Sequence, residues 1–296
     1  MSRVSVALAD GWQRHLDPAW LEAWRPARFD LGDGTTDVVT MGSGPTLLLL
    51  PPLPGFKEAW VATAGRLARS FRVVAFDLRA RAGSWQTLLT DLERIADAFA
   101  PGPAVVIGHS LGGALAQHWA GARPERVSAL VLSSSFARVG NTRGGWRKRY
   151  VEQSLVLASQ RWLPEPLAAR LATRYASRGT WVYDPRCDER ILAFIRHSIR
   201  TVPISTVSGA LSLAFAHDAR EHLPRIACPT LVVVGELETE WARAASAGLA
   251  RDIPNAELRF SPGVAHLHPL SGSEWLAGNI EEWLRATTDA PGAPRD

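Results

Sequence analysis

A chain of 296 residues with 46% hydrophobic residues is long enough to bury a sizeable core, which excludes an intrinsically disordered protein. The formal net charge is +4, but the arginines are scattered and usually lie near Asp or Glu, which argues against a nucleic-acid partner. The one local exception is a group of four basic residues from Arg143 to Arg149, which we interpret as a solvated face.

The cysteines and the N-terminal segment indicate the cellular compartment of the protein. Cys187 and Cys228 match no metal-ligand or redox spacing, so free thiols in a reducing environment are the simplest interpretation. The apolar stretch from Val4 to Ala9 is too short for a signal sequence, and no run approaches the ~18 apolar residues that a membrane span needs. We therefore expect a cytoplasmic protein without a membrane span.

Apolar runs bounded by Gly and Pro predict a series of buried strands along the chain. A leading hairpin is expected from Arg28–Leu31 and Asp37–Met41. The runs that follow are Thr46–Leu50, Phe71–Phe76, Ala104–Ile107, Val127–Leu132 and Thr230–Val234. They alternate with stretches that suit helices, namely Ala59–Arg69, Trp85–Phe99 and Leu111–Ala122. This alternation predicts an α/β fold with a doubly wound, mostly parallel sheet.

The alternation stops after residue 135, where helical patterns without a confident strand begin. We interpret residues 136–222 as an inserted helical segment that divides a core made of residues 1–135 and 223–296. A final amphipathic helix is expected from Ser273 to about Thr287. The insertion is rich in aromatic residues, which either line an apolar acyl pocket or form the core of the insertion: Trp146, Tyr150, Trp162, Trp181, Tyr183, Phe194 and Phe215.

The segment Gly108-His109-Ser110-Leu111-Gly112 places a G-x-S-x-G pattern directly between a buried strand and a helix. Five residues with three fixed positions recur by chance, but this context is specific, because so sharp a turn needs small residues beside the serine. The turn would expose the Ser110 hydroxyl at a helix N-terminus, where developing negative charge is favoured. Ser110 is therefore the candidate nucleophile.

Here the sequence resembles the α/β-hydrolase fold family over nearly its whole length. Besides the Ser110 turn, the resemblance rests on the Pro- and Gly-rich turn after Leu47–Leu50, on Asp77-Leu78-Arg79, and on a late histidine that follows Gly263. The inserted segment after the sixth strand also fits. The resemblance implies an eight-stranded sheet with a helical lid and a catalytic triad of Ser, His and an acid.

The order of triad residues in this family requires a histidine after the last strand to act as the base. His266, after Gly263, matches that place among the eight histidines. His268 is the competitor, with a packing or pocket-rim role as its alternative. His109 is adjacent to the nucleophile and suits packing better, and His118 on the following helix is interpreted as a core or surface residue.

In relatives the triad acid commonly lies three residues past the Gly that ends the seventh strand, and it is usually Asp. That place here is Glu238, three residues after Gly235, so this chain departs in residue type but keeps the charge. Glu236 and Glu240 are close enough to exchange roles with it through a small loop shift. An acid at the end of the sixth strand is not expected, because that strand ends in Ser133-Ser134-Ser135.

The resemblance also implies two backbone N–H donors that form an oxyanion hole, those of Leu111 and Leu53. Relatives often carry His-Gly in the loop before the Leu53 position, whereas this chain has Pro51-Pro52, and proline has no N–H to donate. The loss of the histidine leaves the loop geometry open. Asp77 is interpreted as a structural hydrogen-bond acceptor.

We therefore expect a carboxylesterase-like serine hydrolase that cleaves an ester or related acyl bond through an acyl-enzyme. The partner is a small-molecule substrate with an apolar acyl group, and no metal or organic cofactor is implied. Thioesterase, lactonase, acyltransferase, carbon–carbon hydrolase and perhydrolase chemistry share the same residues and stay open. A non-catalytic ligand-binding module is the alternative from another class. The oligomeric state is undetermined.

Overall fold

The structure is a computed structural model that describes residues 16–79, 84–139, 162–164, 167, 191, 194, 197–198 and 202–288. Most of the predicted lid, including Trp146 and Trp181, lies outside the described residues. What the structure describes in full is the sheet with its covering helices and the end of the inserted segment.

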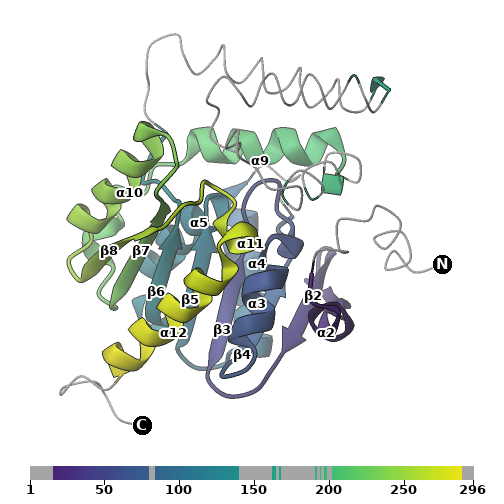
Figure 1. The fold of residues 1–296 in the computed structure, drawn as a ribbon, viewed down its shortest axis with the longest axis horizontal. Coiled ribbons are helices and arrows are strands. Elements are labelled where there is room, and N and C mark those ends of the chain that lie inside the picture. The colour runs from purple at the N-terminus through teal and green to yellow at the C-terminus, as the bar shows by residue number, and fades with distance from the viewer. Residues whose placement is uncertain are drawn as a thin grey trace.

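An eight-stranded sheet forms the centre of the molecule, in the order β1-β2-β4-β3-β5-β6-β7-β8 (Figure 1). β2 pairs antiparallel with both β1 and β4, and all other neighbours are parallel, which confirms the predicted mostly parallel sheet. The strands are β1 (Ala27–Asp30), β2 (Thr35–Met41), β3 (Thr46–Leu50), β4 (Arg72–Phe76), β5 (Ala104–His109), β6 (Val127–Ser133), β7 (Thr230–Gly235) and β8 (Ala256–Ser261).

Helices cover both faces of the sheet, because the central strands are apolar on both sides. In β3, Leu48 and Leu50 belong to one core cluster while Leu47 and Leu49 belong to the other, as the alternation of side chains in a strand requires. The first face carries α4 (Trp85–Phe99), α5 (Leu111–Ala122) and α10 (Glu240–Asp252). The second carries α2 (Pro18–Ala23), α3 (Val61–Leu67), α11 (His268–Ser271) and α12 (Ser273–Thr288).

The helix predicted at Ala59–Arg69 is instead a 3₁₀ turn, η3 (Lys57–Trp60), followed by α3. The turn begins early because the Asp77 side chain accepts a hydrogen bond from the Lys57 backbone N–H, at an N···Oδ1 distance of 2.9 Å. A helical start needs such an acceptor, and here it comes from the end of β4. Two further 3₁₀ turns are η5 (Pro124–Arg126) and η6 (Leu223–Arg225).

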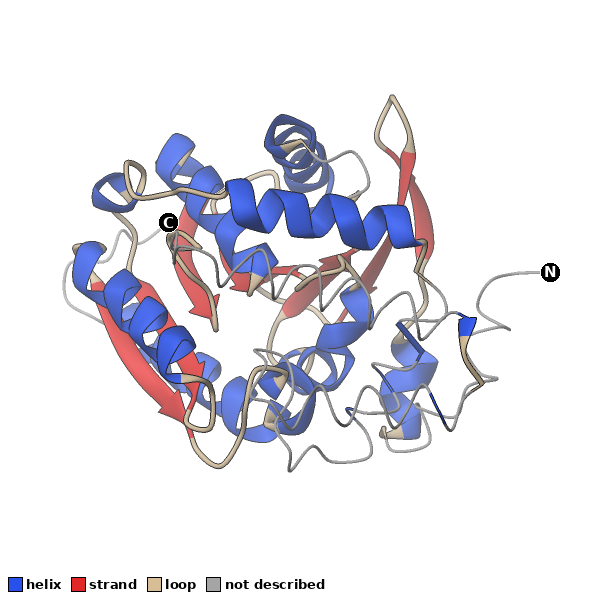
Figure 2. Cartoon of the chain, turned by 90° about the horizontal axis from the view of Figure 1, so that it is seen from above, coloured by secondary structure: helices blue, strands red, loops and turns tan. Residues whose placement is uncertain are grey.

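The last helix of the inserted segment, α9 (Ile204–Ala216), lies across one end of the sheet in Figure 1, and from above it crosses over the strands (Figure 2). Leu213 packs into the core cluster beneath α4 and α5, while Leu211 packs toward the loop after β3. An isolated bridge joins Arg138 and Asp218, so the described ends of the inserted segment meet. Among the described residues, no helix is both long and apolar enough to cross a membrane.

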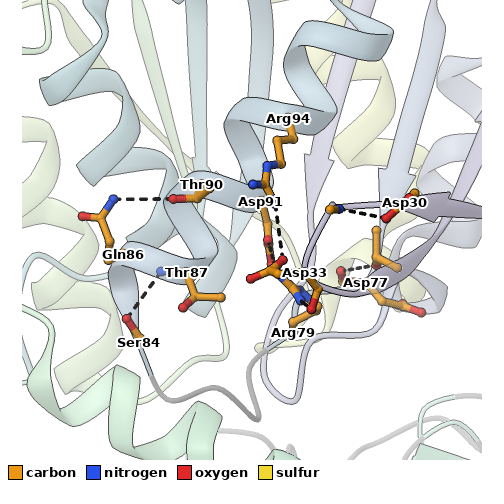
Figure 3. Close-up of polar contacts among 12 residues, drawn as sticks. Asp30, Asp33, Asp77, Arg79, Ser84, Gln86, Thr87, Thr90, Asp91 and Arg94 are labelled. Carbon is orange, nitrogen blue, oxygen red and sulfur yellow. Dashed lines mark hydrogen bonds and ion pairs between the residues drawn. The ribbon is translucent and has the colours of Figure 1, made fainter.

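Arg79 ties three elements together just after β4 (Figure 3). Its guanidinium donates to Asp91 on α4, with an Nε···Oδ2 distance of 2.8 Å, and to Asp33 in the β1–β2 turn, with an Nη2···Oδ1 distance of 2.8 Å. Arg94 adds an ion pair to the same Asp33 carboxylate. This cluster holds the antiparallel edge of the sheet against α4.

Candidate active site

Ser110 occupies the sharp turn between β5 and α5, where its backbone has φ +53° and ψ −113°. A left-handed φ is unfavourable for a residue with a Cβ, and such strain concentrates at functional sites. The turn is held by a hydrogen bond from the Ser110 N–H to the carbonyl oxygen of Ser133, at 2.9 Å. The predicted nucleophile therefore has the strained backbone that the motif requires.

Gly108 and Gly112 are glycines because the turn leaves no room for a side chain. A Cβ on Gly108 would lie 2.5 Å from the carbonyl oxygen of Gly112, and a Cβ on Gly112 would lie 2.2 Å from that of Leu50. These separations are shorter than a non-bonded contact allows. The close approach also brings the start of α5 against the end of β3, and so toward the loop that contains Leu53.

Three predicted residues from distant parts of the chain meet in one hydrogen-bonded line. His266 Nε2 lies 3.1 Å from Ser110 Oγ, and His266 Nδ1 lies 3.0 Å from Glu238 Oε2. All three residues are buried, with exposed fractions of 7% for Ser110, 7% for His266 and 4% for Glu238. This is the arrangement in which an imidazole can accept a serine proton while a carboxylate orients it.

The structure distinguishes the three nearby glutamates. Only Glu238 is buried, whereas Glu236 accepts a hydrogen bond from the Gly263 N–H at 2.9 Å and Glu240 begins α10 on the surface. Burial alone would raise the pKa of Glu238, but the neighbouring His266 and the hydrogen bonds to the carboxylate bring that pKa below its ordinary value. Glu238 is therefore ionised at neutral pH.

The competing histidines are placed away from the Ser110 hydroxyl. His268 Nε2 contacts Ser133 Oγ, and His109 Nδ1 contacts the same serine. His118 Nε2 lies within hydrogen-bonding distance of His217 Nδ1, at 3.1 Å. Of these four side chains and His266, only His266 has a hydrogen bond to Ser110.

The His118–His217 pair makes stability sensitive to acid. Burial lowers the pKa of His118 to about 4 and that of His217 to about 3, so both are neutral at pH 7. Because the folded pKa is below the unfolded one, the unfolded chain binds more protons between the two values, and the free energy of unfolding falls as pH drops from about 7.

We expect His217→Gln to reduce that acid dependence, since glutamine still donates to the Phe136 carbonyl that His217 Nε2 contacts at 2.9 Å but does not titrate. The measurement is urea unfolding of wild type and variant at pH 7 and pH 5. Each histidine contributes at most ~1.4 kcal/mol per pH unit. An equal fall in the free energy of unfolding in both proteins would contradict the prediction.

The serine run at the end of β6 is a part of the site that sequence reasoning set aside for lack of a carboxylate. The Ser133 carbonyl accepts from the Ser110 N–H, Ser134 Oγ donates to Glu238 Oε1, and Ser135 Oγ donates to the Ser110 carbonyl at 3.0 Å. Three consecutive small polar residues directly before the inserted segment were the available signal. The Ser133 carbonyl and the Ser134 and Ser135 hydroxyls hold the nucleophile and the acid in place.

The two predicted oxyanion donors come from different parts of the chain. Leu111 is the first residue of α5, and Leu53 lies half-buried in the loop between β3 and η3. The loop is braced at its far end, because the Leu78 N–H donates to the Gly55 carbonyl at 2.8 Å. The role of these two N–H groups as donors to a tetrahedral oxyanion stays a prediction.

Lys57, at the end of that loop, is a buried cation. Its ammonium Nζ lies 2.9 Å from Asp77 Oδ2 and 3.0 Å from Glu58 Oε1. Burial alone would lower the pKa of Lys57, but the two carboxylates raise it, so the side chain stays charged. Asp77 thus binds both the backbone and the side chain of Lys57, which makes it a structural acceptor that fixes the loop.

The aromatic residues expected to line a pocket or form the lid core are only partly described. Trp162 is 81% exposed, and the rest of the prediction stays untested because most of these aromatic residues lie outside the described residues. The described apolar contact with the loop that contains Leu53 comes from α9, where Val207 and Leu211 pack with Leu53 and Phe56. Among the described residues, no group of three His, Cys, Asp or Glu side chains is arranged to hold a metal ion.

Comparison with known proteins links this geometry to a family. The sequence model described as "Alpha/beta hydrolase family" matches residues 47–278. A pimeloyl-[acyl-carrier protein] methyl ester esterase from Chromobacterium violaceum is 29% identical over 256 residues, which cover 83% of this chain and 97% of that protein.

Two solved structures are similar over most of their length. An esterase from Thermogutta terrifontis has a TM-score of 0.69 at 25% identity, covering 89% of this chain and 99% of that one. An enol-lactonase from Burkholderia xenovorans LB400 has a TM-score of 0.71 at 19% identity, covering 88% of this chain and 100% of that one. At that identity the lactonase supports the fold alone.

Proposed function

This chain belongs to the alpha/beta hydrolase family, and from that premise we propose that it hydrolyses a carboxylic ester through Ser110. The observation that carries the proposal is the unbroken hydrogen-bonded line from Ser110 through His266 to Glu238. Burying a strained serine, an imidazole and a carboxylate together costs free energy of folding. A non-catalytic binding module has no need of that arrangement, whereas a serine hydrolase requires it.

In the proposed reaction, His266 Nε2 removes the proton as Ser110 Oγ attacks the ester carbonyl carbon. Glu238 stabilises the imidazolium that forms, and the N–H groups of Leu53 and Leu111 stabilise the tetrahedral oxyanion. His266 then donates its proton to the departing alcohol, which leaves an acyl-enzyme on Ser110. A water molecule activated by His266 releases the acid and restores the free serine.

The proposed substrate is a small molecule with an apolar acyl group. The support is the face of α9 toward the loop that contains Leu53, where Val207, Leu211 and Phe215 pack with Leu53 and Phe56. An acyl chain bound to Ser110 would be stabilised by contact with such side chains, at ~0.8 kcal/mol for each methylene removed from water. The relative named as a methyl ester esterase supports an oxygen ester as the scissile bond.

A panel of p-nitrophenyl esters of increasing acyl length, run beside matched thioesters and lactones, tests this proposal. We expect kcat/KM to be highest for the oxygen esters and to rise with chain length up to a maximum. A fluorophosphonate probe should label a single residue, Ser110, in the same preparation. Absence of both turnover and labelling would overturn the proposed function, and preference for thioesters or lactones would reassign the bond that is cleaved.

Two leucines on α9 separate a role in substrate selection from a role in packing. Leu211 belongs to the cluster beside Leu53, whereas Leu213 is buried in the main core. We expect Leu211→Ala to move the preferred acyl chain to a longer length, because the smaller side chain enlarges the space beside the loop that contains Leu53. Steady-state kinetics on the ester panel measures the shift.

Leu213→Ala is the matched control on the same helix. It should lower the free energy of unfolding by about 2–5 kcal/mol through the cavity it leaves, without moving the preferred length. If the two variants give the same length profile as the wild type, α9 covers the site without selecting the substrate.

A further inference from the structure

Three imidazoles gather behind the Ser110 turn, and only one of them contacts the nucleophile. The ring centroid of His109, at the end of β5, lies 4.9 Å from that of His266 and 5.3 Å from that of His268. His109 and His268 are fully buried. The proposed reaction uses His266 alone, so two buried titratable side chains beside the base have no role in it.

A hydrogen-bonded chain runs between these two histidines through Ser133. His109 Nδ1 lies 3.0 Å from the Ser133 carbonyl oxygen and 2.9 Å from Ser133 Oγ, while His268 Nε2 lies 2.5 Å from the same Oγ. A carbonyl only accepts, so His109 Nδ1 carries a proton and donates it. The single hydroxyl proton of Ser133 is then donated to His268 Nε2, a tautomer assignment that follows from the network.

We propose that His109, Ser133 and His268 form a positioning network that holds the His266 ring in the orientation from which it accepts the Ser110 proton. The inference rests on the proposed function. Ser133 is the hub, because its carbonyl accepts from the Ser110 N–H at 2.9 Å while its hydroxyl links the two imidazoles. On another side, the His109 ring meets Trp60 edge-on with centroids 6.1 Å apart, which restricts its movement.

Charge supports a network that stays neutral. Burial lowers the pKa of His268 to about 4, and burial with the neighbouring His266 and His268 holds the pKa of His109 well below its ordinary value. Two titratable side chains face His268. His266 lowers the pKa of His268 further, whereas the Glu238 carboxylate raises it. Since neither network histidine is a cation at neutral pH, neither opposes the positive charge that His266 gains during the reaction.

Simple space filling does not explain these residues. Within the described part of the chain, His268 Nδ1 is buried without a hydrogen-bond partner. Two aliphatic side chains would fill the same space without that desolvation cost. The hydrogen bonds through Ser133 are what the two imidazoles add, and one of these imidazoles, His109, lies against the His266 ring.

Removing the hub hydroxyl tests the network with the smallest change. We expect Ser133→Ala to lower kcat on p-nitrophenyl esters by about 10- to 100-fold, since a displacement of ~1 Å in a catalytic group can cost that much. KM should stay within about twofold, because ground-state binding is not altered. The rate of fluorophosphonate labelling at Ser110 should fall in parallel, since that reaction needs the same base.

Ser261→Ala is the matched control. Ser261 is a buried serine at the end of β8 whose hydroxyl has no partner among the described residues, so kcat should match the wild type.

The second pair of variants is His268→Gln and His268→Leu. Glutamine can place an oxygen near the position of Nε2 and accept from Ser133, so it should retain most of kcat, whereas leucine should lose as much as Ser133→Ala.

The outcomes separate this inference from the proposed function. If wild type is labelled at Ser110 but Ser133→Ala keeps its kcat, or if glutamine and leucine at position 268 behave alike, the network is overturned and the function stands. If Ser133→Ala does not fold, the comparison at position 268 decides.

A double variant of Ser133→Ala and His268→Leu should be no slower than either single variant, because both changes break the same hydrogen-bonded chain. Additive losses would overturn the network. If wild type is not labelled at Ser110, the function itself fails.

Discussion

Ser110→Ala is expected to abolish fluorophosphonate labelling and to lower ester turnover by on the order of 10⁴-fold or more. The Ser110 hydroxyl, 3.1 Å from His266 Nε2, is the only side-chain oxygen to which that nitrogen is hydrogen-bonded among the described residues. Labelling is read from intact mass and peptide mapping, and turnover from the release of p-nitrophenol.

The thermal unfolding midpoint of the variant checks that the protein is still folded. Alanine removes one oxygen and keeps the Cβ, so the strained turn should stay folded and the midpoint should equal or exceed that of the wild type. Labelling that persists in a folded Ser110→Ala protein would mean that another residue is the nucleophile.

Glu238→Gln is the second change with a large expected effect, a loss in kcat of about 10⁴-fold. An amide keeps the size of the side chain but does not stabilise the imidazolium, and it can turn its NH₂ toward His266 Nδ1, which favours the wrong tautomer. The carboxylate contacts His266, Ser134 and the Gly235 N–H, so its replacement affects the whole end of β7. Steady-state kcat at saturating ester measures the loss.

Glu236→Gln and Glu240→Gln are the controls in the same loop. Both side chains are exposed, so each variant should stay within about tenfold of the wild type in kcat. Glu236 accepts from the Gly263 N–H in the loop before His266, and a glutamine oxygen can replace that bond. Similar small losses from all three variants would mean that the acid lies elsewhere.

Much of the fold could be predicted because its signals are local. The apolar run of β3, with each of its leucines fully buried, reads as a strand covered on both faces, and α4 and α5 have the predicted bounds. The Ser110 turn was predictable from its local pattern, and Gly108 is required by a contact with Gly112 only four residues away, whereas Gly112 is required by its contact with Leu50 on β3. Spacing along the chain is sufficient wherever the constraint is local.

The sequence by itself therefore predicted the α/β class, the mostly parallel sheet, and Ser110 and His266, with Glu238 ahead of two neighbouring glutamates, and the structure brings Ser110, His266 and Glu238 together. Only the tertiary structure decided which glutamate is buried, that Ser133, Ser134 and Ser135 bind the nucleophile and the acid, and that Trp162 is exposed. The physical reason is sequence separation: Ser134 and Glu238 are 104 positions apart. Such contacts arise from the pairing of β6 with β7, which no local pattern encodes.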